Sequence, residues 1–280
     1  MKQRIITALI LAPLVVLGIF ELSMPLFIAA IAAVTMIGFW EWTQFVKHNS
    51  RVMALIPAAV VMAVILVLLP FEPELLKPLP AAHFAILAIG SIWWVVASLL
   101  AITYPKSVGM WQHSNLLRNA FGWLTLVPFF TSIVLLRAEG AGVDEYYGAK
   151  LVLFVCFLVW SADSGAYFAG KTFGKTKMAP HVSPNKTIEG LVGGIVAALI
   201  VGWGAAQWFE LQFDSWVTMS LIALVTVIIS VLGDLVESMF KRVSGIKDSS
   251  NIIPGHGGVL DRIDSLTAAF PVFALLYFIF

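Results

Sequence analysis

The sequence predicts an all-α integral membrane protein with about nine transmembrane helices, and two features of the chain lead to this expectation. Hydrophobic residues make up 60 % of the 280 residues and charged residues only 12 %, whereas a soluble domain typically carries about 25 % charged residues. Apolar stretches near the roughly 20-residue length of a membrane-spanning helix recur along the whole chain. This composition excludes a soluble globular enzyme, a disordered protein and a nucleic-acid-binding domain.

Nine such stretches are expected to cross the membrane one after another. They are residues 5–20, 22–40, 52–71, 78–105, 119–136, 151–170, 190–209, 215–233 and 265–280. Only Asp163 interrupts the sixth stretch with a charge. Ser23, Met24 and Pro25 are expected to form the first turn, because proline cannot continue the preceding helix.

The first and fifth stretches allow a second interpretation. The first follows a basic start and resembles a signal peptide, but a second apolar run follows at once, which favours a retained anchor. The fifth contains Asn119, Gly122 and Pro128, which weaken the prediction of a helix there. We nevertheless expect both to be membrane-spanning helices.

The distribution of basic residues predicts the orientation. Lysine and arginine near the ends of spans gather on the cytoplasmic side. A cytoplasmic N-terminus places 14 of the 17 basic residues inside, namely Lys2, Arg4, Lys47, Arg51, Lys106, Arg118, Lys171, Lys175, Lys177, Lys186, Lys241, Arg242, Lys247 and Arg262. Only Lys77, Arg137 and Lys150 then lie outside. We therefore expect the N-terminus in the cytoplasm and the C-terminus outside, as in a multi-pass protein of a bacterial-type inner membrane.

Two polar segments, residues 171–187 and 240–261, interrupt the apolar pattern and are expected to face the cytoplasm. No repeat or linker divides the chain, so residues 1–280 are expected to form a single membrane domain. In it, residues 1–150 supply N-terminal helices and residues 151–280 supply the catalytic helices and loops. Gly190, Gly193 and Gly194 indicate close helix packing, which a homodimer interface would also use.

Six carboxylates lie at or just inside the cytoplasmic ends of the last four spans, where charge at membrane depth indicates function. They are Asp163, Glu189, Asp234, Glu237, Asp261 and Asp264. Helical spacing places Asp234, Glu237, Ser238 and Lys241 on one stripe of one helix, and Asp261, Asp264 and Ser265 on a stripe of the next. The glycine-rich run 254–258 lies between the stripes and allows a ligand to approach the backbone closely.

Carboxylates beside a ring of lysine and arginine are typical of phosphoryl or nucleotidyl transfer. The carboxylates hold Mg²⁺, and the cations hold phosphate oxygens. A purely structural alternative is that the carboxylates pair with the loop cations at the membrane surface. For Glu189 and Glu237 the two interpretations are equally open.

Residues 165–172 match the P-loop pattern G-x-x-x-x-G-K-[ST], but the context argues against a P-loop. A P-loop needs a strand before it and a helix after it. Here the pattern lies at the exit of an apolar span. We expect no P-loop, although Lys171 remains a candidate to contact a phosphate.

The stretch from Ser238 to Asp264 closely resembles the signature of the phosphatidate cytidylyltransferases, also called CDP-diacylglycerol synthases. That signature runs S-x-x-K-R-x4-K-D and then H-G-G-x-x-D-R-x-D, and its fixed positions match over 27 residues. The segments 163–167, 183–190 and 233–238 are also similar to that family. The specific resemblance covers residues 151–280.

The resemblance implies that CTP and phosphatidic acid are converted into CDP-diacylglycerol and pyrophosphate, with Mg²⁺ on Asp234 and Asp261. With that reaction, Lys241, Arg242, Lys247 and Arg262 are expected to clamp phosphates, and Asp264 to orient Arg262 or complete the metal shell. His256 is expected to contact the pyrophosphate, with help from the amides of Gly257 and Gly258. The further substrate-binding candidates are Asp163, Lys171, Lys175, Ser183, Lys186, Thr187, Glu189, Ser238 and Asp248.

Two alternatives stay open from the sequence. One is a related membrane enzyme, either a lipid nucleotidyltransferase or a polyprenol kinase. The other is a transporter of a phosphorylated solute, although transporters tend to show inverted repeats and sites at the bilayer midplane. The sequence assigns no role to the first four helices and identifies no residue that reads the cytosine base.

Overall fold

The computed structural model describes residues 2–46, 50–71, 79–140 and 144–280, and this part of the chain contains nine α-helices. They are α1 (Lys2–Glu21), α2 (Met24–Trp42), α3 (Arg51–Leu68), α4 (Ala81–Ile102), α5 (Asn115–Ala138), α6 (Tyr147–Phe173), α7 (Ile188–Trp208), α8 (Trp216–Ser244) and α9 (Leu260–Ile279). A short 3₁₀ helix, η2 (Lys106–Met110), follows α4. Among the basic residues counted for the orientation, Lys47 and Lys77 lie outside the described residues.

The all-α prediction is confirmed, and every expected span corresponds to a helix. Helices α2 to α9 are long and apolar enough to cross a membrane, and in α1 the described apolar part is Leu9–Glu21. The uncertain fifth stretch forms the most buried of these helices, α5, in which 67 % of the apolar window is buried. Its Pro128 is accommodated because it packs directly against Gly90 of α4, which has no side chain.

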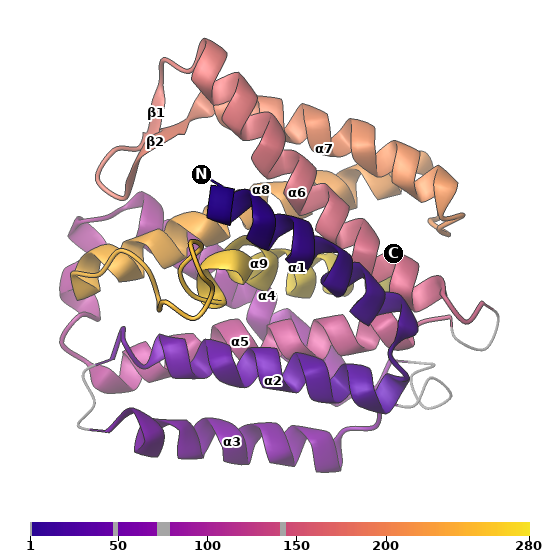
Figure 1. Cartoon of the computed structure of the whole chain (residues 1–280), viewed down its shortest axis with the longest axis horizontal. Helices are drawn as coiled ribbons and strands as arrows, with labels where there is room; N and C mark the ends of the chain where they lie inside the picture. The colour runs from indigo at the N-terminus through magenta and orange to yellow at the C-terminus, as the bar shows by residue number, and fades with distance from the viewer. Residues whose placement is uncertain (1, 47–49, 72–78, 141–143) are drawn as a thin grey trace.

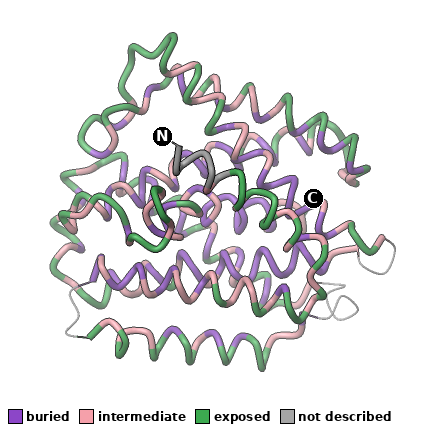
Figure 2. The backbone as a smooth tube through the Cα atoms, viewed as in Figure 1, coloured by how far each residue is buried: buried purple, intermediate pink, exposed green. Residues whose placement is uncertain are grey.

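The helices form a bundle in which α9 lies in the interior against α4, α5 and α8 (Figure 1). Helix α3 lies at one edge beside α2, and the α6–α7 pair lies at the opposite edge. Figure 2 shows buried residues concentrated in the middle of the bundle and exposed residues along the outer helices. Many exposed side chains are large and apolar, such as Val67, Leu116 and Ile200. Such a surface fits lipid rather than water.

Local sequence signals explain where the helices begin and end. Four helices start with a serine or threonine whose hydroxyl accepts a backbone N–H of the first turn, at Ser50, Ser114, Thr187 and Ser215. Helix α8 ends at Gly245, whose φ of 70° is the left-handed conformation that glycine adopts most easily. Helix α8 is 29 residues long, and its last turns continue past the apolar part into the polar residues that include Lys241 and Arg242.

The polar segment 171–187 is more ordered than its composition suggests. It contains a two-stranded antiparallel hairpin, β1 (Lys177–Ala179) paired with β2 (Ser183–Thr187). The hairpin is too short to show an alternating apolar pattern, which is the signal that reveals a strand in a sequence. The hairpin and the loop between α8 and α9 lie at the same end of the bundle (Figure 1).

Helices α6 and α7 pack unusually closely, and the glycines that we singled out serve this contact. A Cβ on Gly194 would lie 2.7 Å from the carbonyl oxygen of Ala162, and one on Gly190 would lie 3.0 Å from that of Ala166. The P-loop pattern at residues 165–172 lies wholly inside α6. The expectation that it forms no P-loop is therefore confirmed, because no loop exists there to surround a phosphate.

Candidate active site

The predicted stripe on α8 is present and meets the start of α9. The hydroxyl of Ser238 donates to Oδ1 of Asp234 at 3.3 Å. One turn further on, Nζ of Lys241 lies 2.9 Å from Oδ1 of Asp261 and 3.6 Å from Oε1 of Glu237. Lys241 therefore connects the two helices through a cation held between buried carboxylates.

Asp261 is positioned by the backbone of the loop that precedes α9, residues 245–259, which we call the signature loop. Its Oδ2 accepts the N–H of Ser249 at 2.9 Å and the N–H of Gly258 at 2.7 Å. Gly257 has a φ of 83°, and a Cβ there would lie 2.6 Å from the same oxygen. Glycine is thus required at 257 by both the backbone conformation and the nearby carboxylate.

A group of carboxylates continues inward from Asp261 along α8 and α9 to α6. Asp264 interacts electrostatically with Asp234 and Glu237, and Glu237 interacts with Asp261. Asp163 of α6 lies within electrostatic reach of Asp234 and Asp264. The structure therefore brings together five of the six predicted carboxylates, and Asp234 is linked to Asp261 through Asp264 and Glu237.

The cations reach this group from two directions. Lys186, at the end of β2, places Nζ 2.6 Å from Oδ2 of Asp234 and 3.2 Å from the carbonyl oxygen of Val231. Arg262 on α9 lies within electrostatic reach of Asp163. The guanidinium of Arg242 donates through Nε to the carbonyl oxygen of Val182 in the hairpin turn, at 3.2 Å. The hairpin is thus attached to α8 at two points, through Lys186 of β2 and through Val182 of the turn.

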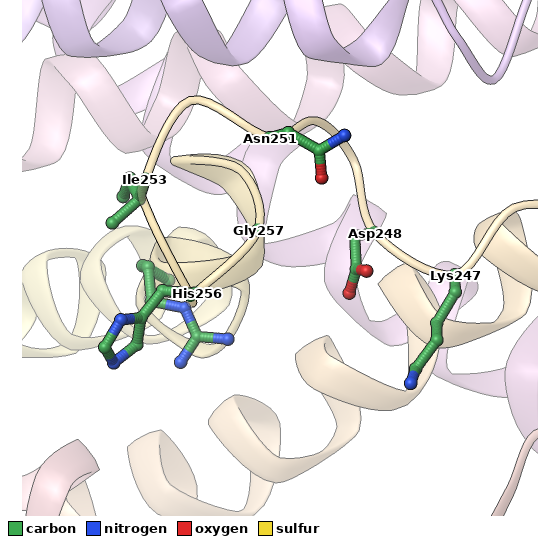
Figure 3. A pocket seen from close by; sticks show the side chains of 8 residues that line it. Lys247, Asp248, Asn251, Ile253, His256 and Gly257 are labelled. Atoms are coloured by element: carbon green, nitrogen blue, oxygen red, sulfur yellow. The ribbon is translucent and has the colours of Figure 1, made fainter. Parts of the chain in front are cut away.

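A polar cavity of about 470 Å³ opens beside the signature loop (Figure 3). Its walls include Lys247, Asp248, Asn251, His256, Gly257 and Arg262. Figure 3 shows Lys247 and Asp248 on one limb of the loop and His256 and Gly257 on the other. Within the described part of the chain, Nδ1 of His256 is buried without a hydrogen-bond partner. A cavity lined by two cationic side chains and an imidazole is suited to an anionic ligand.

The remaining predicted residues lie on or near the hairpin. Oγ1 of Thr187 caps α7 by accepting the N–H of Gly190 at 3.1 Å, and the carboxylate of Glu189 accepts the N–H groups of Lys175 and Thr176. Thr187 is thus used to begin α7, and Glu189 to hold the segment before the hairpin. Ser183 begins β2, while Lys171 lies in the last turn of α6, with its Nζ 5.7 Å from the ring centre of Tyr167.

Sequence reasoning missed Glu41, at the end of α2. Its side chain is fully buried and accepts hydrogen bonds from Ser249, Ser250, Val259 and Leu260 of the signature loop and the first residue of α9. In the sequence, Glu41 is only the charged residue that ends the apolar stretch 22–40. The signal in the sequence was an acidic residue at the end of an apolar stretch with no lysine or arginine three or four residues away to pair with it on the same helix.

The donor set of the site fits Mg²⁺ bound together with a substrate. Among the described residues, no three His, Cys, Asp or Glu side chains are arranged to enclose an ion. Mg²⁺, however, is usually held by one or two carboxylates together with substrate phosphates and water. Asp234 and Asp261 each already present one oxygen to a lysine ammonium. Five carboxyl groups, those of Asp163, Asp234, Glu237, Asp261 and Asp264, therefore lie beside only two directly paired lysines in the described chain, so acidic side chains outnumber these cations where a metal ion would bind.

Apolar spans, convergent carboxylates and an anion-binding cavity define a membrane-embedded enzyme that acts on phosphate groups. The sequence pattern of the Cytidylyltransferase family matches residues 2–280, and the chain belongs to this family. It is 44 % identical to the phosphatidate cytidylyltransferase of Haemophilus influenzae over 99 % of both chains. It is also 44 % identical to that of Pseudomonas aeruginosa, over 99 % of this chain and 96 % of the relative, and 34 % identical to that of Bacillus subtilis, over 100 % and 97 %.

Proposed function

We propose that this protein transfers the cytidylyl group of CTP to phosphatidic acid and releases pyrophosphate, which yields CDP-diacylglycerol for phospholipid biosynthesis. The observation that carries the proposal is the arrangement of the matched signature. Residues 238–264 fold into two helical stripes and a loop that place carboxylates and cations around one polar cavity. The relatives that are named phosphatidate cytidylyltransferase match the chain over nearly its full length.

The reaction needs no nucleophilic side chain, because the substrate brings its own ionised oxygen. A phosphate oxygen of phosphatidic acid attacks the α-phosphorus of CTP and forms a new P–O bond. The bond from the α-phosphorus to the bridging oxygen breaks, and its electron pair leaves with pyrophosphate. The task of the protein is therefore to align the two substrates and to offset the developing negative charge.

The side chains divide this task by their chemistry. Asp234 and Asp261 would hold Mg²⁺, which when bound offsets the negative charge of the triphosphate. Lys247, Arg262 and His256 line the cavity, where they are suited to bind the β- and γ-phosphates. Lys241 and Lys186 hold the two aspartates in place before the substrate arrives.

An assay with purified protein tests this proposal. The protein in detergent is given phosphatidic acid, Mg²⁺ and each α-labelled nucleoside triphosphate in turn. We expect labelled lipid and an equal amount of pyrophosphate from CTP, and none after chelation of Mg²⁺. In a parallel assay with γ-labelled ATP and a polyprenol, labelled lipid would instead identify a lipid kinase. The absence of any lipid product, with solute uptake by vesicles, would identify a transporter.

The active site is proposed to face the cytoplasm of a bacterial-type inner membrane, since CTP is cytoplasmic and basic residues dominate this end of the bundle. A reporter that is active only in the cytoplasm should function when it is fused within residues 174–187 and fail when it is fused after Phe280. The reverse pattern would overturn both the orientation and the side of the site. A homodimer is a further expectation, which the mass of the protein in detergent would test.

A further inference from the structure

Glu41 is a fully buried carboxylate in the half of the chain that lies outside the family signature. Its oxygens accept four hydrogen bonds from residues more than 200 positions away. Oε1 accepts from Oγ of Ser250 at 2.5 Å and from N of Val259 at 2.9 Å. Oε2 accepts from Oγ of Ser249 at 3.1 Å and from N of Leu260 at 2.6 Å. Each oxygen therefore binds one serine hydroxyl and one backbone N–H.

These four donors flank the part of the signature loop that lines the cavity. Ser249 and Ser250 begin the stretch, and Val259 and Leu260 end it at the start of α9. The cavity-lining residues Asn251, Ile253, Gly255, His256 and Gly257 all lie between the two points of attachment. One side chain from α2 thus closes the loop that forms much of the cavity.

The chemistry of a carboxylate suits this place. The first N–H groups of a helix have no partner within the helix and favour a negative charge. Glu41 satisfies such groups at Val259 and Leu260 from a neighbouring helix. The next residue, Asp261, accepts the N–H groups of Ser249 and Gly258. Glu41 and Asp261 therefore both bind the backbone of the signature loop next to the start of α9.

The packing around Gly258 shows how closely Glu41 approaches the loop. A Cβ at this position would lie 2.5 Å from Oε1 of Glu41 and would also clash with the hydroxyl of Ser249. Gln44, one turn beyond Glu41, donates its side-chain N–H to the carbonyl oxygen of Ser249. The end of α2 and the turn that follows it therefore contact the loop through two side chains, Glu41 and Gln44.

We infer that Glu41 is a positioning residue for the proposed reaction: it joins Ser249 and Ser250 to the start of α9, which closes the cavity-lining part of the signature loop and so holds His256 and Asp261 in the geometry that binds the nucleotide. It touches no substrate itself. The inference rests on the proposed function for its kinetic consequence, whereas its structural consequence is independent of any substrate.

The test uses Glu41→Gln in the full-length protein. Glutamine keeps the shape but replaces one acceptor oxygen with an NH₂ group, which leaves a buried backbone N–H of Val259 or Leu260 unpaired. Hydrogen–deuterium exchange without substrate should become about tenfold faster in residues 249–260 and stay unchanged in α4 and α5. The KM for CTP should rise about tenfold, while that for phosphatidic acid stays within about twofold.

Glu21→Gln is the matched control, because Glu21 is an exposed glutamate that ends the neighbouring helix α1. It should change neither the exchange nor the kinetics. Unchanged exchange in residues 249–260 of Glu41→Gln would overturn the inference, as would equally faster exchange in α4 and α5. If the wild-type protein makes no CDP-diacylglycerol, the proposed function fails, yet the exchange experiment still decides the role of Glu41.

A second variant keeps the inference testable if Glu41→Gln does not fold. Ser250→Ala removes one donor to Oε1, and with it the acceptor of the Ile252 N–H, and leaves the carboxylate in place. It should accelerate exchange in residues 249–260 alone and raise the KM for CTP by about threefold. Where both variants fold, the double variant should lose little more than Glu41→Gln. Multiplicative effects, or a silent Ser250→Ala, would overturn the inference.

Discussion

The signature loop (residues 245–259) and the hairpin segment (residues 174–187) lie at the same end of the bundle but are held there by different forces. The signature loop is held by two carboxylates, those of Glu41 and Asp261, which accept hydrogen bonds from its backbone N–H groups. Both residues are less than 10 % exposed. The hairpin is attached through Lys186 and Arg242, whose contacts with Asp234 and Val182 are only partly buried.

This difference indicates a division of work. Hydrogen bonds to a buried charge are strong, and leaving one unmade is costly. Ion pairs near solvent contribute little and are screened by salt. The signature loop is therefore expected to determine the geometry of the site, while the hairpin supplies a positive charge that adjusts to the ligand.

The largest effect is expected from the aspartates that the two segments contact. Asp261→Asn and Asp234→Asn keep the shape of the side chain but remove an anionic ligand for Mg²⁺, and each should lower kcat/KM by roughly 10²–10⁴-fold. The double variant should lose little more than the worse single variant, because groups that act as a unit are not additive. Raised Mg²⁺ should partly restore the single variants.

Asp144→Asn is the control for this prediction. Asp144 precedes α6 and pairs with Lys150 at 2.7 Å, outside the carboxylate group of the site. Its activity should stay within about twofold, since a surface ion pair contributes about 0–1 kcal/mol. Folded Asp234→Asn and Asp261→Asn proteins with near-normal turnover and unchanged Mg²⁺ dependence would show that these aspartates are ordinary partners of Lys186 and Lys241.

Gly258→Ala should have the next largest effect, because the added methyl group clashes with Ser249 and Glu41 where the loop is tightest. We expect activity to fall by roughly 10–10²-fold, since displacement of a loop by about 1 Å has this effect on aligned groups. Gly204→Ala is the control, because nothing lies within 4 Å of a Cβ there. Equal activity of the two variants would contradict a signature loop of fixed geometry.

Lys186→Met tests the hairpin and should be milder. It removes the cation 2.6 Å from Asp234 but keeps an apolar stem of similar length. We expect kcat/KM to fall by about tenfold or less, and the ratio of wild-type to variant activity to shrink as salt is raised. A loss as large as that of Asp234→Asn, independent of salt, would show that the hairpin determines the geometry of the site as much as the signature loop does.

Thr172→Ala should have the smallest effect. Oγ1 of Thr172 donates to the carbonyl oxygen of Phe168 within α6, at 2.9 Å, and faces solvent. Activity should stay within a few-fold of wild type, because this hydroxyl would hold a metal only in a true P-loop. A loss of about 10³-fold in a folded protein would contradict the helical interpretation of residues 165–172.

The sequence by itself determined the features that depend on neighbouring residues. The thickness of a bilayer fixes the length of an apolar helix, so uncharged stretches were enough to predict the nine helices, including α5 with its Pro128. Helical spacing was likewise enough to place Asp234, Glu237, Ser238 and Lys241 on one stripe. The signature resemblance added the reaction, which spacing alone does not specify.

Only the tertiary structure decided which distant groups meet. The pairing of Lys186 with Asp234, the closure of the signature loop by Glu41 and the crowding at Gly258 join segments separated by 48 to 219 positions. No local periodicity encodes such contacts, because they follow from how the helices pack. A buried carboxylate such as Glu41 is stable only where folding delivers enough donors to replace the water it has lost, and that condition is met by the fold and not by any stretch of sequence.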